Sequence, residues 1–151
     1  MLTLNPTNDS ELGLQLAHAH RLWRAVISQT VAPLGLTPPR WTLLVVLRHL
    51  GEGATQKQLA EALSIELPSL TRTLCQLEDQ GLIERQVRED DRRVREVRFT
   101  GEGRRVLSAL DARANEARAQ LLDGIPPEDR NHLRRMLERI ETNACHCLKN
   151  G

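Results

Sequence analysis

The sequence has few aromatic residues, few cysteines and no long apolar run. Only three of its 151 residues are aromatic, while aliphatic side chains dominate the apolar set, which is typical of helices packed on helices rather than of a large sheet. Three cysteines, two of them separated by a single residue, argue against a disulfide framework and favour a reducing compartment. No stretch approaches the roughly 20 apolar residues that span a bilayer, and no basic start precedes an apolar leader. We therefore expect a cytoplasmic, α-rich protein without membrane association.

The charges are balanced, with a formal net charge of +1. The chain as a whole is therefore not a polycation, and any affinity for nucleic acid must come from a local arrangement of arginines. The length favours one compact domain with an elaboration over two separate domains.

Apolar residues three or four positions apart predict a series of helices. Their ends carry recognisable signals: Thr55 and Gln58 have the spacing of a capping box, Thr100 is placed as an N-cap, and Gly51 and Gly81 are helix stops. The predicted helices cover approximately residues 11–31, 37–50, 55–63, 67–80, 101–123 and 126–150.

Two short runs, residues 82–87 and 94–99, largely alternate apolar with polar side chains and are separated by a charged segment. This pattern predicts a β-hairpin. Two short helices followed by a ribbon with a charged tip is the order of a winged helix-turn-helix. The expected fold is thus mainly α with a small β-hairpin. We expect dimerisation helices in residues 1–35 and 101–151 to flank a DNA-binding domain in residues 36–100.

The helix predicted for residues 67–80 has the properties of a recognition helix. Its leucines lie on one side, and Pro68, Arg72 and Gln76 lie roughly opposite, with Ser69 on the flank. Such a helix can enter a major groove, where Arg contacts guanine and Ser or Gln contacts base edges or phosphates. The alternative is that Arg72 and Gln76 are ordinary solvated surface residues.

The hairpin tip, residues 88–93, combines three arginines with three acids, whereas a bare turn favours Gly, Asn or Pro. An arginine held by a neighbouring acid can enter a narrow minor groove, so the tip is interpreted as a wing. The alternative is a self-neutralising cluster of exposed ion pairs. The complete set of predicted DNA-binding residues is Pro68, Ser69, Thr71, Arg72, Gln76, Arg85, Asp91, Arg92 and Arg93.

The run from Leu36 to Thr100 resembles the MarR family of bacterial regulators, and its SlyA branch most closely. The likeness is carried by a Ser-x-x-Arg-x-Leu pattern that begins at Ser69 and contains Arg72, by an Asp-Arg-Arg wing and by a downstream Phe-Thr. The resemblance implies an obligate homodimer that reads near-palindromic promoter DNA. It also implies that Arg72 serves the major groove, that Arg93 serves the minor groove, and that Asp91 positions the wing. Independently, the first and last helices have apolar stripes that a partner subunit could cover, although they could instead pack on their own winged domain.

Many relatives release DNA when a small aromatic acid binds near the dimerisation helices. In this sequence the region would involve Trp23, Arg40, Trp41 and His18 or His20, which could equally be ordinary core and surface residues. A small aromatic or phenolic ligand is therefore one expectation, and the ordinary packing of these residues is the alternative.

The positions of the cysteines favour neither redox sensing nor metal binding. The first helix has no cysteine near its start, which argues against peroxide sensing of the kind some relatives perform. Cys75 is placed on the outward side of the recognition helix, where an inert surface thiol is favoured over a redox role. The Cys145-His146-Cys147 run lacks the spacing of a structural zinc site, so neither metal nor cofactor is expected.

Two other classes of function are alternatives to DNA binding. An enzyme would need a nucleophile with a base, a phosphate-binding glycine loop or a metal triad, and none can be assembled here. A winged helix used for protein contact is the stronger rival, since a fold does not fix a function. Repression and counter-silencing would use the same DNA contacts, so the direction of regulation stays open.

Overall fold

A computed structural model describes residues 9–150, so the predicted dimerisation segments include residues 1–8 and 151 that lie outside the described part. The chain forms two compact units, one ending at Arg118 and one beginning at Ala119. The first contains all strands and most helices, and the second contains the last turn of α5 and the whole of α6. The elements are α1 (Asp9–Val31), η1 (Ala32–Leu34), α2 (Pro38–Leu50), β1 (Ala54–Thr55), α3 (Gln56–Leu63), α4 (Leu67–Asp79), β2 (Ile83–Val87), β3 (Arg95–Phe99), α5 (Gly101–Leu121) and α6 (Pro127–Asn150).

The predicted helix ends are confirmed by their hydrogen bonds. Thr55 and Gln58 form a complete capping box at the start of α3, with the Gln58 amide 3.1 Å from the Thr55 hydroxyl. Gly81 adopts a left-handed φ of 71°, and the amides of Gly81 and Leu82 donate to the carbonyls of Glu78 and Leu77. This Schellman arrangement satisfies the last carbonyls of α4 and turns the chain directly into β2.

The hairpin is part of a three-stranded antiparallel sheet of order β1-β3-β2, in which Ala54 and Arg85 both pair with Val97. The sequence analysis predicted β2 and β3 but missed β1. This strand has only two residues, too few to show an alternating pattern. The Glu52 side chain reinforces the junction, because it accepts hydrogen bonds from the Arg104 guanidinium at 2.7 Å and the Phe99 amide at 3.1 Å. The Arg104 hydrogen bond is the main reason that the pKa of Glu52 is lowered.

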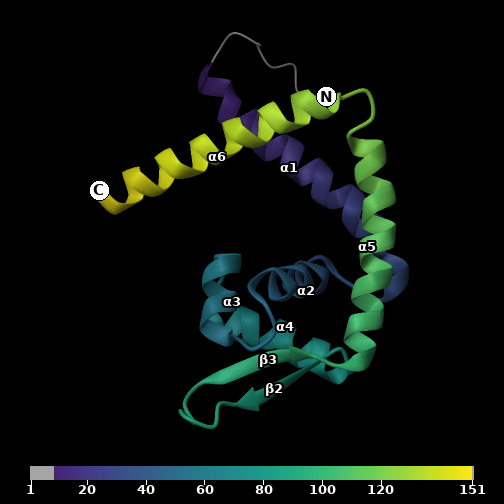
Figure 1. Ribbon diagram of the computed structural model, residues 1–151, viewed down its shortest axis with the longest axis vertical. Coiled ribbons are helices and arrows are strands. Elements are labelled where there is room, and N and C mark those ends of the chain that lie inside the picture. The colour runs from purple at the N-terminus through teal and green to yellow at the C-terminus, as the bar shows by residue number, and fades with distance from the viewer. Residues whose placement is uncertain (1–8, 151) are drawn as a thin grey trace. The chain divides into compact units, whose positions relative to one another are not determined.

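The core of the first unit is aliphatic and centres on α2, α3 and α4, which lie together beside the hairpin (Figure 1). The C-terminal end of α1 contributes Ile27 and Val31, whereas Leu12 and Leu16 from the predicted stripe of this helix are exposed. Burial of leucine and isoleucine side chains stabilises a fold by roughly 1.5–3 kcal/mol each. The fully buried large side chains are Val31, Leu43, Leu44, Leu47, Leu59, Leu70, Leu74, Leu77, Ile83, Val97 and Leu110.

Hydrogen bonds join the start of α5 to the turn that follows α4. The Thr100 amide donates to the Leu82 carbonyl at 3.1 Å, and the Thr100 hydroxyl accepts from the Gly103 amide at 2.9 Å, which confirms Thr100 as an N-cap. A Cβ on Gly103 would lie only 1.8 Å from the Leu82 carbonyl oxygen, so this backbone approach requires glycine. By contrast, a Cβ on Gly101 would meet no atom within 4 Å.

No helix among the described residues has the length and apolarity needed to cross a membrane.

We predict opposite effects for alanine at these two glycines. Gly103→Ala should lower the free energy of unfolding by about 1–3 kcal/mol or more, because the Leu82 backbone must move. Gly101→Ala should be neutral or stabilising by up to about 1 kcal/mol, because alanine favours the helix. Urea unfolding followed by circular dichroism at one protein concentration measures both. Equal stability of the two variants would contradict the close contact.

Candidate nucleic-acid interface

Helix α4 presents an apolar face to the core and a polar face to solvent, as predicted. Leu70, Leu74 and Leu77 are fully buried, while the exposed residues gather toward its N-terminal half. The preceding turn is tight, because Ser64 takes a left-handed φ of 52° and ends α3. The exposed members of the predicted set on α4 are Pro68, Ser69, Thr71 and Arg72.

Gln76, one turn after Arg72, is only half-exposed. Its carboxamide oxygen accepts a hydrogen bond from Arg40 Nε, at 3.3 Å, so α2 as well as α4 shapes this part of the surface. The C-terminal end of α4 is also held by a hydrogen bond, because Gln80 Nε2 donates to the Gly35 carbonyl at 3.1 Å.

Arg85 was predicted to contact DNA, but in the structure its guanidinium is paired with an acidic side chain of α4. Its guanidinium forms an ion pair with Glu78, in which Arg85 Nε lies 3.0 Å from Glu78 Oε2, and its side chain is only 17% exposed. The Arg85 amide also donates to Glu78, at 3.2 Å. The hydrogen bond from Arg85 is the main cause of the lowered pKa of Glu78. Arg85 therefore braces β2 against α4, and we do not include it in the proposed interface.

Cys75 is less exposed than the sequence analysis expected. Its sulfur lies 3.5 Å from a terminal nitrogen of Arg85, and the residue is half-buried. The angular count around α4 separated its leucine face from the opposite face, but it could not show that β2 packs against the flank that carries Cys75.

The hairpin tip forms the predicted charged turn. The Asp91 carboxylate accepts from the Arg93 amide at 3.1 Å and from Arg93 Nε at 3.2 Å. Hydrogen bonds from the backbone and then the side chain of Arg93 lower the pKa of Asp91 and so favour the charged carboxylate. The Arg93 side chain is nevertheless 91% exposed. It is oriented by Asp91 and free to meet a ligand.

A second arginine of the tip is held inward. Arg88 Nε lies 2.7 Å from Glu96 Oε1, on the neighbouring strand. Hydrogen bonds from Arg88 and then Arg98 lower the pKa of Glu96. Arg92, by contrast, is exposed. The sequence analysis expected acids to hold the tip arginines, but it did not identify Glu96 as the partner of Arg88.

Three of the residues predicted for an effector pocket make hydrogen bonds to different neighbours. Arg40 points toward Gln76 on α4, whereas its neighbour Trp41 donates to the Ser28 hydroxyl on α1 at 3.0 Å. His18 and Trp23 are half-buried on α1, and a ring nitrogen of His18 lies 3.2 Å from Arg21. Adjacent residues of a helix point about 100° apart, which explains why Arg40 and Trp41 face different elements.

Arg24, which the sequence analysis did not single out, contributes to the packing between α1 and α2. Its guanidinium lies 5.5 Å from the centre of the Trp41 ring and donates to the Thr42 hydroxyl at 3.2 Å. This stacking is a cation–π contact, and it makes Trp41 part of the packing between the two helices.

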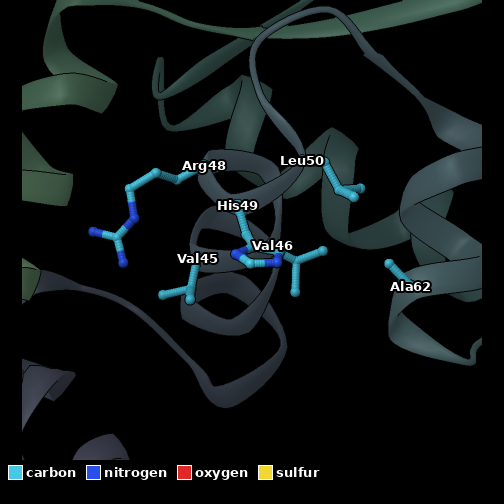
Figure 2. Close-up of a pocket in the computed structure, with 6 residues that line it drawn as sticks. All are labelled: Val45, Val46, Arg48, His49, Leu50 and Ala62. Atoms are coloured by element: carbon cyan, nitrogen blue, oxygen red, sulfur yellow. The ribbon is translucent and has the colours of Figure 1, made fainter. Parts of the chain in front are cut away.

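An open hollow lies elsewhere, on the C-terminal half of α2 and beside α3 (Figure 2). Arg48 and His49 line it together with apolar side chains, and the Arg48 guanidinium also pairs with Asp111 on α5. None of the predicted effector residues lines it. Its lining residues are Val45, Val46, Arg48, His49, Leu50 and Ala62.

Comparison with known proteins identifies relatives that share this fold. The sequence model of the MarR family matches residues 36–94. The transcriptional regulator PA3341 is 32% identical, with a TM-score of 0.82 over 89% of this chain and 98% of that one. CouR from Rhodococcus jostii RHA1, bound to p-coumaroyl-CoA, is 25% identical, with a TM-score of 0.75 over 85% and 90%.

A serine-for-cysteine variant of E. coli MarR in complex with operator DNA is 21% identical, with a TM-score of 0.79 over 91% of this chain and 99% of that one. The fold is therefore shared along almost the whole chain. With its winged helix-turn-helix and these relatives, the chain belongs to the MarR family of transcriptional regulators.

Proposed function

We propose that this regulator binds near-palindromic promoter DNA as a homodimer, with α4 in the major groove and the hairpin tip in the minor groove. The observation that carries the proposal is the pairing of Asp91 with an almost fully exposed Arg93 at the tip of a hairpin. The Arg85–Glu78 ion pair ties this hairpin to α4. Support also comes from the similar E. coli MarR variant, which was crystallised with operator DNA.

The two elements supply different contacts. Arg72 is exposed on α4, where a guanidinium can make a bidentate contact with guanine in the major groove. Arg93 projects from a narrow turn that can enter a minor groove, where negative potential is concentrated. Arg92 is exposed beside it and is placed to contact phosphates. The Asp-Arg-Arg wing also supports a SlyA-like branch. A regulator that binds promoter DNA would act in the cytoplasm and would be associated with the nucleoid while bound.

The homodimer is supported by apolar surface that one chain leaves uncovered, taking each helix separately. On α1, Leu12, Leu14, Leu16 and Leu22 are exposed. On α6 no residue is buried, although Leu133, Met136 and Ile140 recur at helical spacing. Exposed large apolar side chains that cluster on a helix are typical of surfaces that associate. A two-fold dimer would place its recognition helices about 34 Å apart, to meet successive major grooves.

A small aromatic or phenolic acid is the proposed class of effector. The support is the similar CouR structure, which contains p-coumaroyl-CoA, and the hollow in which apolar side chains lie beside Arg48 and His49. An apolar pocket with a few polar groups suits such a ligand. Adding p-coumarate to the DNA-binding assay below tests this class, and dissociation of the DNA is the expected response.

The central experiment is a fluorescence-anisotropy titration against the protein's own upstream DNA and a scrambled duplex. Arg72→Ala should weaken binding to the best site by about 1–3 kcal/mol and reduce discrimination against single-base variants. Arg113→Ala removes an equally exposed arginine from α5 and should have little effect. If the parent protein prefers neither duplex, winged-helix contact with a protein becomes the better interpretation.

The wing offers a charge-matched comparison. Arg93→Ala should weaken binding and reduce the slope of log K against log salt by about 0.9 if one phosphate contact is lost. Asp91→Ala should also weaken binding, because the arginine loses its support. Asp90→Ala removes the same charge from the same turn without touching Arg93, so it should bind DNA as well as the parent or better. Tighter binding by both aspartate variants would show that Asp91 does not orient the wing.

Dimerisation is tested by sedimentation. At micromolar concentration the parent should have twice the 17.1 kDa chain mass. Met136→Glu should raise the dimer dissociation constant by more than about tenfold, because an unpaired charge would be buried at the interface. Asn131→Glu adds the same charge on another side of α6 and serves as the control. A parent that stays monomeric would exclude the paired half-site mechanism.

A further inference from the structure

The contact between Arg40 and Gln76 joins two helices next to the proposed reading surface. Arg40 is in the first turn of α2, and Gln76 follows Arg72 by one turn on α4. Their side chains meet with Arg40 Nε 3.3 Å from Gln76 Oε1, and both residues are half-exposed. The bond spans 36 positions of sequence, so no local pattern reveals it.

The chemistry of the pair fixes which way the Gln76 amide points. A glutamine carboxamide has an acceptor oxygen and a donor nitrogen, whereas a guanidinium has donors only. The group facing Arg40 must therefore be the oxygen. Among the described residues, none accepts a hydrogen bond from the Gln76 amide nitrogen, which leaves this NH₂ group as the part of the side chain available to a ligand.

Arg40 is itself held in place. One of its terminal nitrogens lies 3.5 Å from the Gly35 carbonyl oxygen, and the same carbonyl accepts from Gln80 Nε2 at 3.1 Å. Gly35 adopts a left-handed φ of 74°, which turns the chain between η1 and α2. The loop before α2 thus supports both Arg40 and the last turn of α4.

We propose that Arg40 is a positioning residue that makes Gln76 a donor-only reader of the major groove. The inference rests on the proposed function, because it requires α4 to face base edges. A free glutamine pairs with adenine through an accepting oxygen and a donating nitrogen. With its oxygen directed at Arg40, Gln76 is not oriented to form this pair. Its NH₂ group instead selects a base whose edge offers acceptors, and guanine, with O6 and N7, offers two.

The test compares base preference, not affinity alone. Full-length parent, Arg40→Met and Gln76→Ala proteins are titrated against duplexes in which each operator position carries each of the four bases in turn. The parent should prefer guanine over adenine at one position of each half-site. Arg40→Met preserves much of the side-chain volume but removes the donors. It should improve binding to adenine relative to guanine at that position by about tenfold, within the range of one bidentate contact.

Gln76→Ala should abolish the preference at the same position, and adding Arg40→Met to it should change the preference no further. Gln76→Glu is nearly isosteric and keeps an oxygen for Arg40, but it presents a second acceptor instead of a donor. It should therefore favour cytosine, whose N4 amine donates. Ratios between bases cancel any general loss of affinity or stability.

Three results would overturn the inference. Equal weakening for all four bases in Arg40→Met would assign Arg40 to a phosphate contact. An unchanged preference profile in both Gln76 variants would show that Gln76 does not read bases. A parent that prefers adenine at the position that Gln76→Ala affects would show that Arg40 leaves the amide oxygen when DNA binds. Failure of the proposed function is distinguishable, because the parent itself would not prefer its own upstream DNA to a scrambled duplex.

Discussion

The ion pair between Glu78 and Arg85 sets the spatial relation on which the interface depends. A recognition helix and a wing can bind one stretch of DNA only when their mutual orientation is fixed. Arg85 stands in β2 and Glu78 in the last turns of α4, and the carboxylate receives both the guanidinium and the backbone amide of Arg85. A largely buried arginine whose charge is compensated in this way acts as a brace. The exposed arginines stay available for the proposed contacts with DNA.

Much of the fold was predictable because local sequence determines it. Helical periodicity located every α-helix, and the capping box at Thr55, the N-cap at Thr100 and the Gly81 stop placed several of the boundaries. The short strand β1 was missed, since its two residues become a strand only by pairing with β3. The close approach of Gly103 to Leu82 was equally invisible, because it depends on two chain segments meeting in space.

The site was predictable where partners are near in sequence and unpredictable where they are distant. Asp91 and Arg93 lie two residues apart, and the expected support of the arginine by the acid is present. Gln76 and Cys75 were both placed on an open surface, yet their partners Arg40 and Arg85 come from other elements. A helical count gives the direction of a side chain but not what packs against it. For the same reason the contact of Arg40 with Gln76 on α4 was not expected from the sequence.

The hydrogen bonds between Asp91 and Arg93 also affect the entropy of the proposed association with DNA. An arginine side chain carries about 2 kcal/mol of rotamer entropy, part of which is normally lost when it enters a confined groove. Asp91 restricts Arg93 while the protein is still free in solution. This loss therefore belongs partly to the folding of the turn, and less of it falls on the encounter with DNA. In the proposed complex with DNA, this preorganisation favours affinity without any additional contact.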